Sequence, residues 1–139
     1  LDTLWGLGQN ILIQEFIAES RGRDVRALVV GGRVVGAMRR MARVGEFRSN
    51  IHRGGEGRAI QLGPDYQSVA VKACEVMGLQ VAGVDLLESK RGPKVIEVNS
   101  SPGFEGLEAA TGKDIASEIL EYAVTYAARR KASRKRART

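Results

Sequence analysis

Two acidic side chains in the second half of the sequence are placed where they could bind a metal ion together. The apolar residues of 81–88 and 94–99 are typical of two β-strands, and the segment between them is rich in turn-forming residues. If this predicted hairpin is symmetric about Arg91, Asp85 lies directly opposite Glu97, and both side chains leave the same face of the sheet. Like charges at opposed positions destabilise a strand pair, so we expect a cation between these carboxylates.

Asn99 adds an amide oxygen to that face, because it follows Glu97 by two residues and side chains alternate along a strand. Carboxylate and amide oxygens suit a hard cation such as Mg²⁺, which is commonly held by one or two carboxylates together with water and phosphate oxygens. The spacing leaves a second interpretation open, in which the carboxylates are solvated and neutralised by Lys94 or Arg91. The Gly- and Pro-containing turn 100–106 favours the metal site, since such a turn can present backbone N–H groups to an anion.

The carboxylates need a sheet whose other face is buried, and the pattern predicts one. On the other face of the hairpin we expect a core side made of Val84, Leu86, Ile96 and Val98. Further strands are predicted at 11–17, 25–30 and 34–41, and helices at 64–78 and from residue 115 onward.

Two connecting segments complete the predicted organisation. Gly31-Gly32 accepts the positive φ of a tight hairpin, and the polar, Gly-rich stretch 43–58 is predicted to be a long loop. Because hairpins dominate and regular strand–helix–strand units are absent, we expect an α+β fold, an antiparallel sheet with helices packed on one face.

Composition restricts the class of protein. The chain has 139 residues, of which 43% are hydrophobic and 27% are charged, which suits one globular domain. The longest apolar run is far shorter than the ~20 residues of a membrane-spanning helix. A single cysteine, Cys74, cannot build a disulfide framework. We therefore expect a cytoplasmic protein with no membrane contact.

The net charge of +6 is concentrated at the C-terminus. Residues 129–139 hold seven basic side chains and no acidic one, while the remaining 15 basic residues nearly balance the 16 acidic ones. We divide the chain into a globular part, 1–128, and a basic tail, 129–139. The tail is expected to be a solvated end or an arm that contacts phosphate.

Four blocks of sequence, in this order, resemble the ATP-grasp carboxylate–amine ligases. Residues 81–87 and 95–103 resemble the metal-binding end of that fold, and Gln14-Glu15-Phe16-Ile17 resembles its adenine-binding hinge. Residues 45–55 resemble the nucleotide and substrate loop of the RimK branch, which adds glutamates to the C-terminus of a small-subunit ribosomal protein. The similarity extends from about residue 11 to 122, and the chain is expected to be the C-terminal lobe of an ATP-grasp fold.

The resemblance assigns roles to individual residues. It implies that ATP and Mg²⁺, or Mn²⁺ in its place, are the cofactors. The nucleotide would contact Glu15 and Phe16 at adenine, Asp24 near the ribose, and Arg48, Ser49 and Asn50 at the phosphates. Arg48 and Asn50 would also act on the reacting groups, and Arg40 would face phosphate. The metal ligands would be Asp85, Glu97 and Asn99.

The function implied is an ATP-dependent ligase that adds glutamate to a ribosomal protein through an acyl phosphate. The chain starts at Leu1 and lacks a candidate phosphate-binding lysine and glycine-rich lid, so we expect a fragment that is inactive alone. The partners would be glutamate, the ribosomal protein C-terminus, ribosomal RNA at the basic tail, and a second copy in a homo-oligomer. Two alternatives stay open: an ATP-grasp ligase for another amino-acid, peptide or carrier-protein substrate, and a non-catalytic, basic-tailed binding module.

Overall fold

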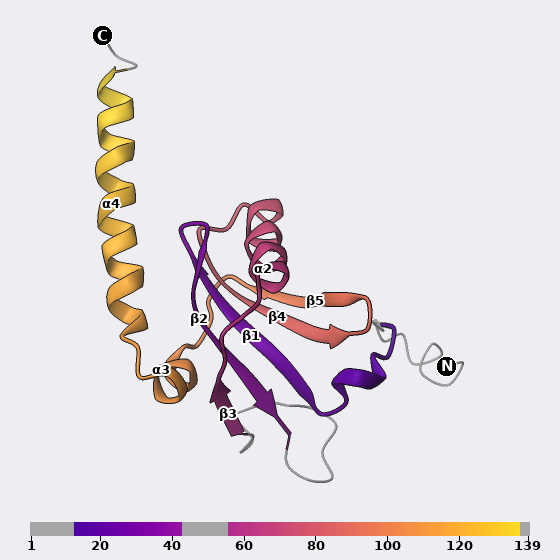
Figure 1. Cartoon of the computed structure of the whole chain (residues 1–139). Coiled ribbons are helices and arrows are strands. Elements are labelled where there is room, and N and C mark those ends of the chain that lie inside the picture. Colours follow the sequence, from indigo (N-terminus) through magenta and orange to yellow (C-terminus); the bar gives the residue numbers. More distant parts are fainter. Residues whose placement is uncertain (1–12, 43–55, 137–139) are drawn as a thin grey trace, which may run out of the picture.

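Five strands form one antiparallel sheet in the order β3-β2-β1-β4-β5 (Figure 1). The structure is a computed structural model that describes residues 13–42 and 56–136. The strands are β1 (Arg23–Val30), β2 (Arg33–Met41), β3 (Glu56–Ala59), β4 (Val81–Ser89) and β5 (Gly92–Asn99). The helices are the 3₁₀ turn η1 (Ala18–Ser20), α2 (Pro64–Val76), α3 (Glu105–Thr111) and α4 (Ile115–Arg136). The predicted α+β class with an antiparallel sheet is confirmed.

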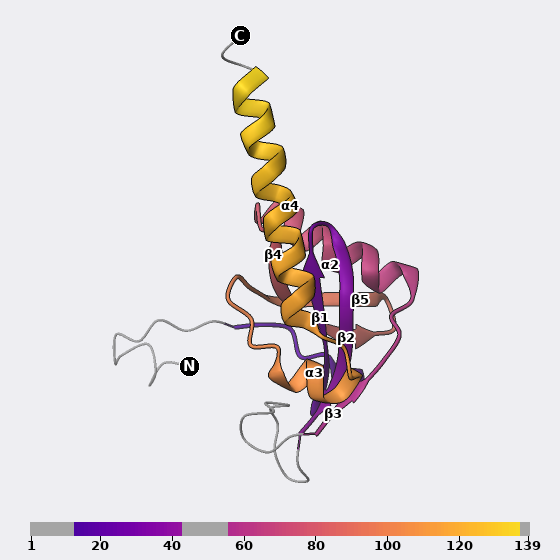
Figure 2. The same cartoon turned by 90° about the vertical axis from the view of Figure 1, so that its left-hand side faces the viewer.

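Both faces of the sheet are used for packing, because β1 is apolar on both. Val25, Ala27 and Val29 pack toward α2, in a core that includes its buried residues Ala70 and Cys74. Alternate residues of the same strand, Leu28 and Val30, belong to a second core with Leu107 of α3 and Ile115 of α4. We expected helices on one face only, and this prediction is wrong. A central strand that is apolar on both faces must be covered on both. Figure 2 shows α3 and the start of α4 in front of the sheet.

The two hairpins are built from short turns. Gly31 and Gly32 have φ values of 58° and 80°, and they join Val30 to its partner Arg33, as predicted. The second hairpin turns at Lys90-Arg91, with Ser89 opposite Gly92.

A bulge in β5 sets the register that matters for the site. The register shifts between Asp85 and Leu86, so that Ile96 is the extra residue and Asp85 still lies opposite Glu97. The predicted pair is therefore confirmed, although the hairpin is not symmetric about Arg91. Ile96, which we expected on the core side, is 38% exposed because the bulge removes it from the regular alternation.

Three other segments differ from prediction or lie outside the described residues. Residues 13–17 form no strand, and 11–12 are outside the described part of the chain. Residues 43–55 of the predicted loop are also outside it, whereas 56–59 form the edge strand β3 beside β2. The sequence did not predict this short strand, because it lies at the edge of the sheet and its exposed residues show no alternation of apolar and polar side chains. In the described ranges no helix is both long and apolar enough to cross a membrane.

Helix α4 is fixed to the sheet by residues of its first two turns, from Ile115 to Tyr122. Its N-terminal N–H groups are satisfied by carboxylates, since Glu108 accepts from the backbone of Ile115 and Asp114 from that of Ser117. The hydrogen bonds that Ser117 donates lower the pKa of the Asp114 carboxyl. The Tyr122 ring lies against Gly31. The helix then continues to Arg136, so it includes most of the segment that we separated as a basic tail, 129–139.

The contact between Gly31 and Tyr122 can be tested with a matched pair of substitutions. Both Gly31→Ala and Gly32→Ala place a Cβ at positive φ, which costs about 1 kcal/mol or more. Only at Gly31 does the added Cβ overlap the Tyr122 ring, because nothing lies within 4 Å of the corresponding position at Gly32. We expect urea unfolding to show a loss of at least about 2 kcal/mol for Gly31→Ala and a smaller one for Gly32→Ala. Equal losses would mean that Tyr122 does not pack there.

Candidate functional site

The face of the sheet that packs against α3 is apolar at one end and carries charged residues at the other. Asp24, Arg26, Arg40 and Asp85 alternate with the residues that face α2, so they share a face with Leu28 and Met38. The apolar half of this face is covered by α3 and the start of α4 (Figure 1). A sheet face that is apolar at one end and charged at the other is suited to bind a polar ligand beside a rigid core.

The charges form a connected row across the strands. Asp24 is paired with Arg40 of β2, and Arg26 is paired with Asp85 of β4. The Asp24 oxygens accept hydrogen bonds from Arg40 Nε at 2.6 Å and from its Nη2 at 2.8 Å. Asp85 Oδ1 accepts from Arg26 Nε at 2.8 Å, and Oδ2 accepts from Arg26 Nη2 at 2.8 Å and from Arg40 Nη2 at 2.7 Å. Two guanidinium groups thus hold the Asp85 carboxylate in one orientation.

Burial makes this row sensitive to the loss of any member. Asp85 is 4% exposed, Asp24 6% and Arg40 8%. Burial alone would lower the pKa of Arg40, but its hydrogen bond to Asp24 and the nearby charge of Asp85 outweigh burial and raise that pKa above its ordinary value. Arg40 therefore stays charged. Removing one partner of a buried ion pair leaves an uncompensated charge and lowers the stability of the fold, so both carboxylates depend on their arginine partners.

Glu97 ends the row and differs from the other members. It lies opposite Asp85 on β5 and is exposed. Within residues 13–42 and 56–136, its carboxylate has no hydrogen bond or ion pair. The alternative that Lys94 or Arg91 neutralises it thus finds no support in the described contacts. Glu97 offers oxygen atoms to a ligand from outside.

Asn99 lies two residues farther on β5, opposite Gly83. Its Oδ1 accepts a hydrogen bond from the backbone N–H of Ser101 at 2.9 Å, which fixes the side chain and the turn that follows. This turn packs closely on the sheet, because a Cβ at Gly83 would come within 2.9 Å of Pro102. Helix α3 after the turn has only seven residues, so its N-terminus does not by itself constitute an anion site.

Asp85, Glu97 and Asn99 offer carboxylate and amide oxygens, the donor types that a divalent cation such as Mg²⁺ takes. All three come from the paired strands β4 and β5, and in the ladder Glu97 and Asn99 share a face with Asp85. Asp85 is already compensated by Arg26 and Arg40, so the free charge of the set resides on Glu97. In the described part of the chain no group of three or more His, Cys, Asp and Glu residues could hold a metal ion. The predicted set therefore depends on the Asn99 amide oxygen.

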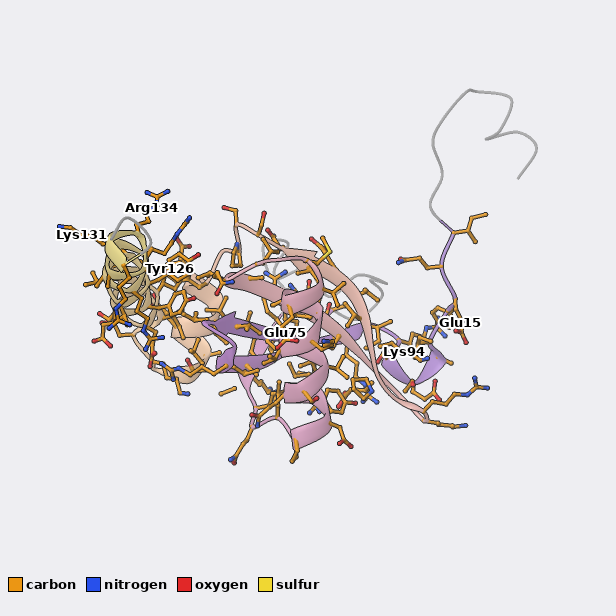
Figure 3. All side chains as sticks on the ribbon, turned by 90° about the horizontal axis from the view of Figure 1, so that it is seen from above. Glu15, Glu75, Lys94, Tyr126, Lys131 and Arg134 are labelled. Atoms are coloured by element: carbon orange, nitrogen blue, oxygen red, sulfur yellow. The ribbon has the colours of Figure 1, made fainter. Side chains whose placement is uncertain are left out.

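The residues predicted to bind the nucleotide are only partly described. Glu15 is exposed and Phe16 is 56% exposed, on the segment before η1; Figure 3 shows Glu15 at the side of the sheet remote from α4. Asp24 is buried and bound to Arg40. Arg48, Ser49 and Asn50 lie outside the described residues.

Arg26 is a residue of this site that the sequence analysis missed. The available signal was that Arg26 follows Asp24 by two residues and so shares its face, in a strand whose residues from Ala27 to Val30 are apolar and buried. Arg40 was predicted to face phosphate, and the structure places its guanidinium on two carboxylates.

A cavity on the other face of the sheet is separate from this site. It is lined by Val25, Arg39, Ile60, Gln61, Leu62, Gly63, Tyr66 and Glu88. Arg39 and Glu88 form an ion pair there at 2.7 Å. Since Val25 and Arg39 are cross-strand partners on the α2 side, the cavity shares no residue with the charged row.

Comparison with known sequences gives one family and a consistent set of relatives. The profile of the RimK-like ATP-grasp domain matches residues 1–123. The probable alpha-L-glutamate ligase of Syntrophotalea carbinolica is 57% identical over 122 residues, which are 88% of this chain and 40% of that protein. The probable alpha-L-glutamate ligase of Aeromonas salmonicida is 58% identical over 121 residues, 87% of this chain and 41% of that protein. The chain thus spans about two fifths of the length of these relatives.

Solved structures share the fold. The ATP-grasp ligase PsnB, complexed with a phosphomimetic variant of a minimal precursor, Mg and ADP, matches with a TM-score of 0.64 and 25% identity. The match covers 81% of this chain and 34% of PsnB. The D-alanine–D-alanine ligase of Bacillus anthracis, complexed with ATP, matches with a TM-score of 0.54 and 16% identity over 76% of this chain and 38% of that one, which shows the fold alone.

The charged row should make a large contribution to stability through Arg40. In Arg40→Leu the carboxylate of Asp24 loses both hydrogen bonds that Arg40 donates, and Asp85 loses one, so we expect a loss of about 3 kcal/mol in the free energy of unfolding. Arg40→Lys keeps the charge without the planar fork and should lose less. The matched control is Arg58→Leu, because Arg58 is exposed and its pair with Glu56 spans 3.4 Å. Similar losses for Arg40→Leu and Arg58→Leu in urea unfolding would contradict the role given to Arg40.

Proposed function

The chain belongs to the family of RimK-like ATP-grasp domains, and we propose that it is the metal-binding lobe of an ATP-dependent ligase that adds glutamate to the C-terminus of a ribosomal protein. The observation that carries this proposal is the placement of Glu97 and Asn99 beside a rigidly held Asp85 on one face of the paired strands β4 and β5. The names of the curated relatives, probable alpha-L-glutamate ligases, support glutamate as the amino acid. A cytoplasmic location is part of this proposal.

The reaction that we propose has two steps. The terminal carboxylate of the acceptor takes the γ-phosphoryl group of ATP, which forms an acyl phosphate and ADP. The amine of glutamate then attacks the acyl carbon, an amide bond forms, and inorganic phosphate leaves with the bonding electrons. Both steps bring anions together, so the task of the protein is mainly positioning and charge neutralisation.

Asp85, Glu97 and Asn99 are the residues that would hold Mg²⁺, with Mn²⁺ as a substitute. When bound, the ion supplies positive charge to the phosphates of ATP. Arg26 and Arg40 fix the orientation of the Asp85 carboxylate. Asn99 is similarly fixed by its hydrogen bond from Ser101.

The remaining assignments follow from the resemblance. Glu15 and Phe16 would contact adenine, and the exposure of both in this chain leaves them accessible to a ligand. Arg48, Ser49 and Asn50 would contact the phosphates, with Arg48 and Asn50 directed at the transferred group.

A second acceptor class is supported by one comparison. The PsnB structures are complexes with a precursor peptide, and PsnB resembles this chain at a TM-score of 0.64. A peptide whose reacting carboxylate belongs to a side chain would use the same phosphoryl transfer. The acceptor, and not the metal site, would then differ from the first proposal.

The metal assignment can be measured without turnover. We expect Glu97→Gln to weaken Mn²⁺ binding to the chain about tenfold or more, because the substitution removes the free negative charge from the donor set. Electron paramagnetic resonance reports free Mn²⁺ directly. The matched control is Glu75→Gln, an exposed carboxylate that Figure 3 shows on α2, the helix on the other face of the sheet. Equal affinity in the two variants would contradict the assignment.

The proposed activity is tested by mass spectrometry. The protein carrying this chain is incubated with ATP, glutamate and a peptide that ends in the C-terminal sequence of the ribosomal protein. We expect the peptide to gain the mass of a glutamyl residue while an equal amount of ADP forms. Modification of a peptide with a blocked C-terminus but with free acidic side chains would favour the second acceptor class. Absence of both products would overturn ligase activity.

A further inference from the structure

Helix α4 continues well beyond the body of the protein. Its first part contributes Ile115, Ile119 and Tyr122 to the core, whereas all described side chains from Ala123 onward are exposed. Figures 1 and 2 show the second half of the helix standing away from the sheet. The match to the RimK-like profile ends at residue 123, so the projecting part lies beyond the matched residues.

A ladder of side chains runs along α4 from Tyr122 into the projecting part. The hydroxyl of Tyr122 donates a hydrogen bond to Gln80 Oε1 at 2.6 Å. The ring of Tyr122 stacks on that of Tyr126, with centroids 5.8 Å apart, and the Arg130 guanidinium lies 5.9 Å from the Tyr126 ring centre. These contacts occur at intervals of four residues, so they join one turn of α4 to the next. The base of the projecting helix is therefore tied to the sheet.

The projecting part is basic on several sides. No acidic residue follows Glu121, and residues 129–139 carry seven basic ones. Arg129, Arg130 and Lys131 are consecutive, so they point in directions about 100° apart around the helix axis. Figure 3 shows Lys131 and Arg134 directed into open space. Like charges at Arg130 and Arg134 are also separated by four residues and repel each other, which a polyanion would relieve.

This distribution favours a nucleic acid over other polyanions. An acidic protein surface or a membrane contacts one side of a helix, and a membrane-surface helix also needs large apolar residues on that side. Between Ala127 and Arg136 the apolar residues are all alanines. A helix that lies along a groove meets phosphates of both strands, which matches basic residues that point in several directions.

We infer that the basic part of α4, residues 129–136, binds the phosphate backbone of structured RNA. The charge pattern supports a nucleic acid, and the choice of RNA rests on the proposed function, because a ribosomal acceptor would place RNA beside the ligase. The helix would then hold the enzyme near its acceptor, and it takes no part in the phosphoryl transfer.

Fluorescence anisotropy with a labelled RNA hairpin tests this inference. The tail variant replaces Arg129, Arg130, Lys131 and Arg134 by Gln. The control variant removes the same charge from exposed residues elsewhere by replacing Arg58, Lys72, Lys90 and Arg91 by Gln. At about 100 mM salt we expect the tail variant to bind at least tenfold more weakly than the unchanged chain. The slope of the logarithm of the binding constant against the logarithm of the salt concentration should become shallower by about one for each phosphate that is no longer bound. The control variant should stay within about twofold.

Three outcomes would overturn the inference. Equal weakening in the tail and control variants would show that only net charge matters. Competition by polyglutamate as strong as by unlabelled RNA would indicate an acidic protein partner. Tighter binding to a DNA hairpin of the same sequence would reject RNA. A chain that ends at Ala128 provides a second variant, and it should lose as much affinity as the tail variant.

The ligation assay tests the proposed function independently of RNA binding. Ligation to a short peptide should be unchanged in the tail variant, since the peptide carries no RNA. Ligation without RNA binding would overturn the inference about α4 and leave the proposed function standing. RNA binding without ligation would overturn the proposed function and leave the inference about the helix.

Discussion

The Asp85 carboxylate is held by two guanidinium groups, and the arrangement of the candidate site depends on this interaction. Arg26 and Arg40 reach it from the neighbouring strand β1 and from β2, so three strands fix one side chain. Without them, a buried carboxylate opposite another carboxylate would carry a high electrostatic cost. With them, Asp85 is compensated, and Glu97 is left as the charge that a ligand can neutralise.

The rest of the fold can be understood as support for this row. The α2 side of the sheet is a continuous core, and the α3 side is divided between a core and the charged residues. The strand β1 therefore has to be apolar on one face along its whole length and on the other face along half of it. The bulge at Ile96 then brings Glu97 into register with Asp85.

Much of this could be predicted from the sequence, for reasons that differ between residues. The pair of Asp85 and Glu97 was predicted from a hairpin symmetric about Arg91; the turn lies at Lys90-Arg91 instead, and the bulge restores the predicted pair. The bulge at Ile96 could not be predicted, since it depends on a two-residue turn at Lys90-Arg91 that is compatible with more than one register. Arg26 could not be assigned to the site, because its partner Asp85 is 59 residues away in the sequence and only the order of the strands brings the two together.

The most direct test of the metal site is anomalous diffraction at the manganese edge, from crystals of this protein grown with Mn²⁺ and ADP. We predict a single peak within coordination distance of Asp85, Glu97 and Asn99, with Arg26 and Arg40 still on Asp85. Well-ordered density for these residues with the manganese peak located elsewhere, or with no peak, would contradict the account.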